Sequence, residues 1–151
     1  MSNEANFDAL VKETIANDGK SGDLTALDNL YGQVLALPTW HFIARGEFPD
    51  VRPYVASHPN YAEGKPMIRA FTDLDRLQRF VKENKLDDAN GSHMVVSIPT
   101  ESIIDYLEQF TSQGVHGIWF NSDTVSDGFF VPLTQLRTIK NRLLHIGWKQ
   151  P

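Results

Sequence analysis

The sequence predicts an α+β domain in which a mixed sheet of about five or six strands is flanked by helices, with two of the helices at the N-terminus. The main observation is a unit that occurs three times in the second half of the chain. In each copy a short apolar run stops at a Thr or Pro, and an amphipathic helix then begins. The three apolar runs are residues 67–71, 95–98 and 129–131. A second observation is the length of 151 residues, which fits a single domain over 1–151.

Two helices are expected before the sheet, as an extension over about residues 4–37. The second of them has Asp23 as a credible N-cap and ends before Pro38. Gly32 lies inside this helix, where glycine costs about 1 kcal/mol relative to Ala, so the sequence predicts a close packing contact there. The apolar positions of the first helix are Phe7, Leu10, Val11 and Ile15.

The sheet-containing core is expected over about residues 39–147. Its first strand is predicted at Thr39–Arg45, where Trp40, Phe42 and Ala44 alternate onto one face. Residues 46–65 are rich in Gly, Pro, Asp and Asn, with a short extended piece near Tyr54. Loops of this length are often functional.

The later elements follow from turn and cap signals. Residues 117–120 are predicted to form a strand that returns as a hairpin to 129–131. Thr72 with Asp75 is a shortened capping box for the helix that follows the 67–71 strand. Gly147 is the expected stop of the last helix.

Composition excludes several classes of protein. The net charge is −5 and the basic residues are scattered, so nucleic acid is not an expected partner. No apolar stretch approaches the roughly 18 residues of a membrane span, and the N-terminus lacks the pattern of a signal peptide. The chain contains no cysteine, which suits a cytoplasmic location.

No residue pattern predicts catalysis, a cofactor or a metal. The five histidines form no local zinc signature, although His41, His93 and His116 lie on or beside predicted strands and would converge if the sheet brought them together. Separate histidines are the default expectation. The runs Gly19-Lys20-Ser21 and Asn121–Gly128 match neither a phosphate loop nor a calcium loop.

A ligand site is one possible function of the repeated units. If the three strands run parallel, the helix N-termini at Thr72, Thr100 and Thr134 gather at one edge of the sheet, where free N–H groups attract small anions. His93 or His116 would then add a titratable group. The alternative is that the threonines or their neighbours simply cap the helices.

Part of the chain resembles the SseB family of bacterial proteins. The segment 66–77 (PMIRAFTDLDRL) resembles the family's strand ending in Phe-Thr, which leads into a helix with Leu in its first turns. Residues 117–121 and 128–133 resemble its later strand–loop–strand–helix portion, with Asn121-Ser122-Asp123 where the family pattern has Asn-Pro-Gly. The likeness covers about residues 38–147. Members of this family are poorly characterised, so the resemblance implies a cytoplasmic bacterial protein and supplies no catalytic residues.

The leading expectation is a non-enzymatic protein-interaction or regulatory module, with a homodimer as a reasonable assembly. Its partner is unknown. The alternative is a small-ligand-binding protein or enzyme that uses the sheet edge near the helix N-termini. Aromatic side chains near the irregular region and the C-terminus are the candidate interface anchors, although they are equally able to fold back over the sheet. These are Trp40, Phe48, Tyr54, Tyr61 and Trp148.

Overall fold

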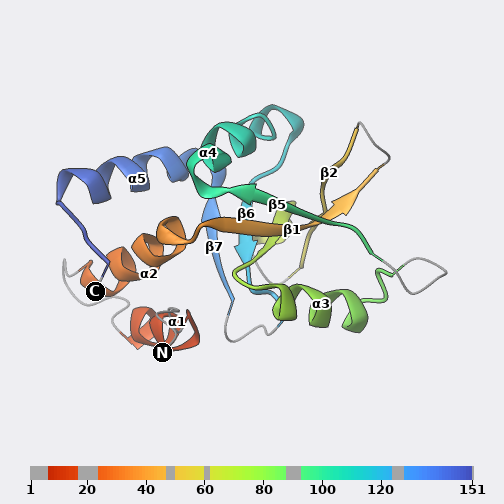
Figure 1. Ribbon diagram of the computed structural model, residues 1–151, viewed down its shortest axis with the longest axis horizontal. Coiled ribbons are helices and arrows are strands. Elements are labelled where there is room, and N and C mark those ends of the chain that lie inside the picture. The colour runs from red at the N-terminus through yellow and green to blue at the C-terminus, as the bar shows by residue number, and fades with distance from the viewer. Residues whose placement is uncertain are drawn as a thin grey trace.

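The polypeptide forms a mixed sheet with helices on both faces (Figure 1). The structure is a computed structural model, and it describes residues 7–16, 24–46, 50–59, 62–87, 93–123 and 128–150. The predicted α+β class and the two N-terminal helices are confirmed. The described residues contain seven strands, slightly more than expected. The two additional strands are short and lie in the segment that the sequence marks as irregular: β2 (Arg52–Pro53) and β3 (Val55–Ala56).

The longer strands form the order β5, β1, β4, β6, β7. Strand β1 pairs antiparallel with β5 and with β4, β4 pairs parallel with β6, and β6 pairs antiparallel with β7. The short β2 and β3 pair with the ends of β1 and β4. The bounds are β1 (Thr39–Arg45), β4 (Met67–Phe71), β5 (Val95–Pro99), β6 (Gly117–Phe120) and β7 (Phe129–Pro132).

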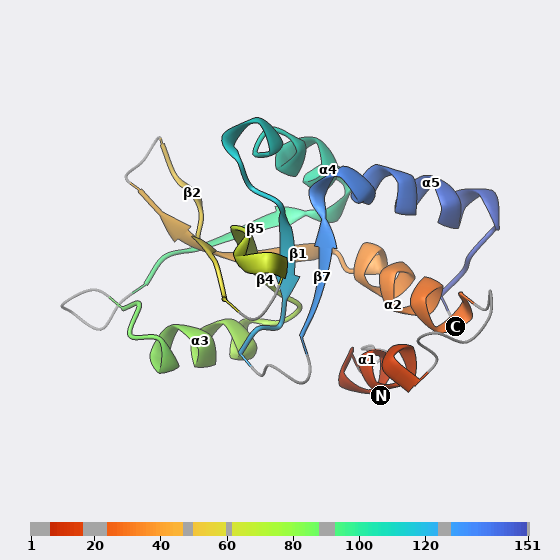
Figure 2. The ribbon, with the colours of Figure 1, turned by 180° about the vertical axis from the view of Figure 1, so that it is seen from behind.

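Two apolar clusters occupy the two faces of the sheet. On one face, α1 (Phe7–Ala16), α2 (Thr25–Ala36) and α4 (Thr100–Glu108) cover inward side chains of the strands, with the start of α5 (Leu136–His145) beside them. On the other face, α3 (Leu74–Glu83) covers a smaller cluster. The views from opposite sides agree that α2 and α5 lie at one end of the molecule and α3 at the other (Figures 1 and 2).

The two faces of β1 follow its alternating sequence. Trp40 and Phe42 are fully buried in the larger cluster, whereas Ile43 belongs to the smaller one. The Trp40 indole packs edge-on against Phe120, and its Nε1–H donates to the Val34 carbonyl at 2.9 Å. Because the indole is a large apolar group with one polar atom, this bond lets it be buried without an unsatisfied donor.

The cap of α3 differs from the prediction. Asp73, not Thr72, is the N-cap, and its Oδ1 accepts the Arg76 N–H at 2.9 Å. Gly147 does follow the end of α5 in a left-handed conformation, as expected. The predicted cap at Asp23 lies outside the described residues.

Candidate functional site

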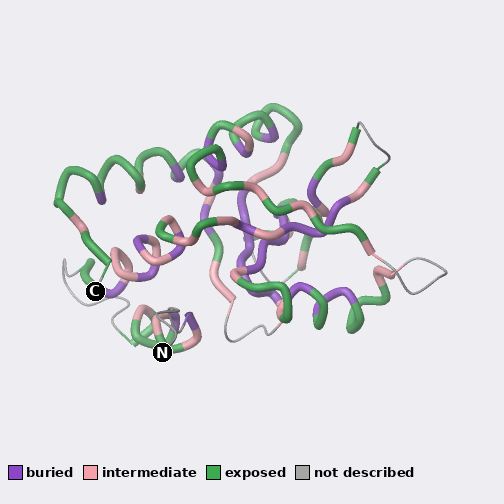
Figure 3. The backbone as a smooth tube through the Cα atoms, viewed as in Figure 1, coloured by how far each residue is buried: buried purple, intermediate pink, exposed green. Residues whose placement is uncertain are grey.

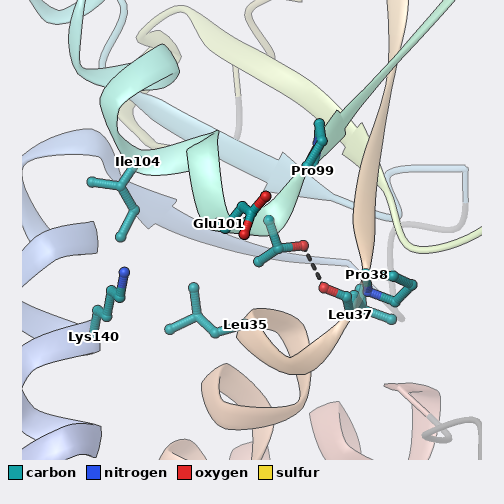
Figure 4. Close-up of a pocket in the computed structure, with 8 residues that line it drawn as sticks. Leu35, Leu37, Pro38, Pro99, Glu101, Ile104 and Lys140 are labelled. Carbon is teal, nitrogen blue, oxygen red and sulfur yellow. Dashed lines mark hydrogen bonds between the residues drawn. The ribbon is translucent and has the colours of Figure 1, made fainter.

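A groove lined mainly by apolar residues runs between α2, α4 and α5. One section, of about 370 Å³, lies where the end of α2 meets the start of α4 (Figure 4). A second section, of about 210 Å³, lies between α2 and the far half of α5. Leu35 and Lys140 line both sections, so the two sections adjoin along the groove.

The groove exists because α5 extends beyond the sheet. Along most of its length α5 is exposed, with only isolated buried positions (Figure 3). Three contacts hold its far half beside α2. Arg142 forms a two-pronged ion pair with Asp28, at 3.0 and 2.9 Å. Trp148 packs on Gly32, and its Nε1–H donates to Asn29 at 3.1 Å.

The walls of the groove are mainly apolar. Leu144 is 70% exposed and Ile146, just beyond the helix, is 46% exposed, so the apolar surface extends past the lining onto the outside of α5. Such contiguous apolar surface is typical of interaction sites. The apolar lining residues are Leu35, Ala36, Leu37, Pro38, Pro99, Ile104, Leu143, Leu144 and Trp148.

Two charged side chains line the first section, Glu101 from α4 and Lys140 from α5 (Figure 4). Neither forms an ion pair with any other residue that the structure describes. By contrast, both arginines of α5 are in ion pairs. Arg137 binds Asp105 and Glu108, and Arg142 binds Asp28. The groove therefore offers one ammonium group and one carboxylate, neither of them in an ion pair with a described residue, beside apolar walls.

Thr100, one of the predicted ligand residues, lies at the floor of the first section. Its N–H donates to the Pro38 carbonyl at 3.1 Å, and its hydroxyl donates to the Leu37 carbonyl. Both donors are therefore used to join α4 to the end of α2. Thr100 shapes the groove but has no donor to spare for a ligand.

Thr72 lies at a different place, where the parallel strands β4 and β6 end. Its N–H donates to Asn121 Oδ1 at 3.0 Å, and its hydroxyl accepts from Asn121 Nδ2 at 3.1 Å. Asn121 is fully buried and has a left-handed backbone, with φ of 56°. These bonds connect the ends of the two strands and leave the donors of Thr72 engaged.

A charged network lies beside this pair. The Asp123 side chain is fully buried, and it contacts Arg79 at 3.0 Å and Arg76 at 3.4 Å. Burial raises the pKa of Asp123 above its usual range, although the two guanidinium groups oppose that shift. Arg76 is partly buried, which by itself lowers its pKa, but Asp123 and Asp8 outweigh that effect and raise the pKa. Because Asp8 belongs to α1 and also pairs with Arg76, the network joins α1 to the sheet edge.

The predicted gathering of three helix starts at one edge is wrong. Strand β7 runs antiparallel to β6, so the turn that contains Thr134 lies at the opposite edge from Thr72. Thr72 and Thr100 do follow parallel strands, but α3 and α4 cover opposite faces. The three positions therefore do not form a shared anion site.

The histidines also remain apart. His41 bonds Ser97 at 2.7 Å, His93 bonds Asp87 at 2.9 Å, and the main chain of His116 pairs with Pro66 at the start of β6. Within the described ranges, no three His, Cys, Asp or Glu side chains are placed to hold a metal ion.

The expected aromatic patch is not exposed where the structure describes it. Trp40 is fully buried, which corrects its prediction as an interface anchor. Tyr54 is half-buried against Phe80, with the Arg45 guanidinium 5.3 Å from its ring centre. Phe48 and Tyr61 lie outside the described residues. Of the three anchors that the structure describes, Trp148 is the one that lines the groove.

Sequence reasoning missed Glu101, Lys140 and the exposure of Leu144. The last helix carries two adjacent leucines, Leu143 and Leu144, and adjacent positions on a helix point about 100° apart, so they cannot both face one core. Leu143 is buried and Leu144 is exposed. That adjacency was the available signal for a second apolar face.

A scan against protein-family models and searches of curated proteins and of solved structures found no match. The resemblance to the SseB family therefore stays a prediction. In the described residues, no helix is both long enough and apolar enough to cross a membrane.

Proposed function

We propose that this protein is a protein-interaction module that binds a helix of a partner protein in the groove between α2, α4 and α5. The observation that carries the proposal is the apolar groove, whose two adjoining sections extend to the exposed side chain of Leu144. An amphipathic helix that lays its apolar face into such a groove is a recurring mode of recognition. We also propose, as the sequence leads us to expect, that the protein acts in the cytoplasm of a bacterium.

The charge of the groove indicates the chemistry of the partner. Helix α5 carries Arg137, Lys140 and Arg142 but no acidic residue. Since Arg137 and Arg142 are already paired within the chain, Lys140 is the cation left for a partner. A helix with a carboxylate beside its apolar stripe would complement it, and such a charge contact would favour correct orientation.

The alternative, a small-ligand site at the sheet edge, has less support. The donors of Thr72 and Thr100 are engaged in bonds within the chain, and Thr134 lies at the other edge. A ligand site needs several convergent polar groups. The groove supplies apolar area instead, which suits a macromolecule.

A library of displayed amphipathic helical peptides tests the proposal. The library is selected on the wild-type protein, and the enriched peptides are measured by fluorescence anisotropy against variants. We expect enriched peptides to combine an apolar stripe with acidic residues. Leu144→Asp should weaken binding by about tenfold or more, because burying a leucine contributes about 1.5–3 kcal/mol.

Matched controls lie on α3, away from the groove. Leu74 is also an exposed leucine and Lys82 an exposed lysine, so Leu74→Asp and Lys82→Glu make the same chemical changes elsewhere. Lys140→Glu should weaken the acidic peptides, whereas Lys82→Glu should not. If the selected peptides bind Leu144→Asp as tightly as the wild type, or if no peptide is enriched, the proposal is wrong.

A further inference from the structure

Strand β5 (Val95–Pro99) is an open edge of the sheet. It pairs with β1 on one side, and no described strand pairs with its other side. Residues 94–99 carry no charged side chain, and Met94 and Val95 are 53% and 38% exposed. Proteins commonly protect edge strands with charges, bulges or covering loops, because an exposed edge is a template for pairing with another chain. Proline at the end of this strand, Pro99, is the only such device within it.

The hydrogen bonds to β1 determine which main-chain groups face outward. The Ala44 N–H donates to the Met94 carbonyl, and the Thr100 N–H donates to the Pro38 carbonyl. In an antiparallel pair, bonded and non-bonded residues alternate. The main-chain N–H and C=O groups therefore point toward β1 at Met94, Val96 and Ile98. At Val95 and Ser97 they point away from β1.

We propose that two copies of this chain associate through β5, with the strands antiparallel and a two-fold axis beside Val96. In this register Val95 of each copy faces Ser97 of the other, and each such pair exchanges both of its main-chain bonds. Shifting the axis to Ser97 would place Val95 opposite Pro99, which has no N–H to donate. The register at Val96 satisfies all the outward groups of Val95 and Ser97.

A second copy fits this edge better than an unrelated peptide because the edge is complementary to itself. An antiparallel pair of identical strands is symmetric, and a two-fold interface uses the same patch on both subunits. The chain has a net charge of −5, which opposes association over most surfaces, but no charges would meet along residues 94–99. Met94 would lie opposite Ile98 of the second copy, on the same face of the joined sheet, so apolar area would be covered as well.

Single cysteines provide a sharp test, because the chain has no cysteine of its own. Residues that face each other in a non-bonded antiparallel pair have Cα atoms about 4.5 Å apart, within the range that a disulfide spans. Under mild oxidation, Val96→Cys should form a covalent dimer as its main product. Met94→Cys should not, because residue 94 faces residue 98 rather than itself. Leu144→Cys controls for random collision at an exposed site.

Proline and alanine at position 97 separate the main-chain contact from the side chain. Ser97→Pro removes an outward N–H and leaves the bonds to β1 intact, so this variant should be a monomer of 17.1 kDa by light scattering. Ser97→Ala loses the same hydroxyl but keeps the N–H, and should remain a dimer like the wild type. Circular dichroism of both variants checks that the fold is kept.

Three results would overturn the proposal. They are a wild-type protein that is monomeric at every concentration measured, cross-linking at position 94 as fast as at 96, or a Ser97→Pro variant that is folded and still dimeric. A monomeric wild type would leave the β5 edge to an extended peptide of another protein.

Discussion

Trp148 packs against Gly32 so closely that a Cβ atom at position 32 would overlap the indole ring. The glycine costs α2 helical propensity, and in return the tryptophan can dock on the helix and anchor the C-terminal segment beside it. This contact forms one end of the groove between α2 and α5. A residue that weakens its own helix therefore helps to build the proposed binding surface.

Replacing Gly32 by alanine should destabilise the protein in spite of the better helix former. The indole is rigid and hydrogen-bonded to Asn29, so overpacking should cost about 1–3 kcal/mol. In a Trp148→Ala background the same substitution should instead stabilise the protein by up to about 1 kcal/mol, because only the higher helix propensity of alanine then remains. Urea unfolding of the two single variants and the double variant measures both signs. Equal effects of Gly32→Ala in the two backgrounds would show that the contact does not matter.

Arg69 is a buried cation with no carboxylate partner among the described residues. Its guanidinium lies 4.2 Å from the Trp119 ring centre and 5.7 Å from that of Phe80, and its Nε has no hydrogen-bond partner. One nitrogen donates to the Ala56 carbonyl at 3.2 Å. Burial lowers the pKa of the guanidinium, which indicates that the environment disfavours the charge.

Methionine at position 69 should therefore leave stability unchanged or raise it, because a buried charge is costly to desolvate and methionine fills a similar volume. Arg69→Lys should destabilise, since it keeps a charge and loses the planar group that stacks on the rings. In chemical unfolding, the midpoint of Arg69→Met should equal or exceed that of the wild type. The midpoint of Arg69→Lys should be lower than that of the wild type. A loss above about 1 kcal/mol for methionine would mean that the ring contacts outweigh desolvation.

Asn121 lies in the chain between the end of β6 and Asp123 of the charged network. We expect Asn121→Gly to lose about 1–3 kcal/mol, because the partly buried N–H of Thr72 is left without its acceptor. Asn121→Ala should lose about 1–2 kcal/mol more, since its φ of 56° is unfavourable for a residue with a Cβ and no polar side chain. Thermal unfolding should therefore rank wild type above glycine and glycine above alanine. An alanine variant at least as stable as the glycine variant would contradict the backbone part of this explanation.

The sequence was most informative where local signals agree. Apolar runs that stop at a Thr or Pro correctly placed β4 before α3 and β5 before α4, and a glycine inside a helix correctly predicted a close contact. The alternation of β1 placed Trp40 on the same face as Phe42, and both are buried. Treating Trp40 as an exposed anchor contradicted that alternation.

Other features depend on contacts between distant segments. The hairpin from β6 to β7 was predicted, but the parallel pairing of β4 with β6 has no local signal, and the two pairings together place Thr134 at the other edge from Thr72. The groove likewise depends on how far α5 extends past the sheet, which is fixed by Arg142 with Asp28 and by Trp148 with Gly32. The spacing of apolar residues within a single helix does not predict contacts between residues so far apart in the chain.

His41 should make stability depend on pH in a definite direction. Burial lowers the pKa of His41 below its ordinary value of 6.5, with Asp73 partly opposing the shift. The unfolded chain therefore takes up the proton first as the pH falls, so the stability that neutral His41 allows is present above 6.5 and is lost as the pH drops toward the lowered value.

Comparison with His41→Gln isolates this effect, because the other titrating groups are common to both proteins and their contributions cancel. Urea midpoints measured at about pH 8 and about pH 5 should fall more for the wild type than for His41→Gln. The difference should be modest, since His41 is only half-buried and bonds Ser97 on an open face of the sheet. A glutamine variant that loses as much stability on acidification as the wild type would show that His41 does not contribute to the pH dependence.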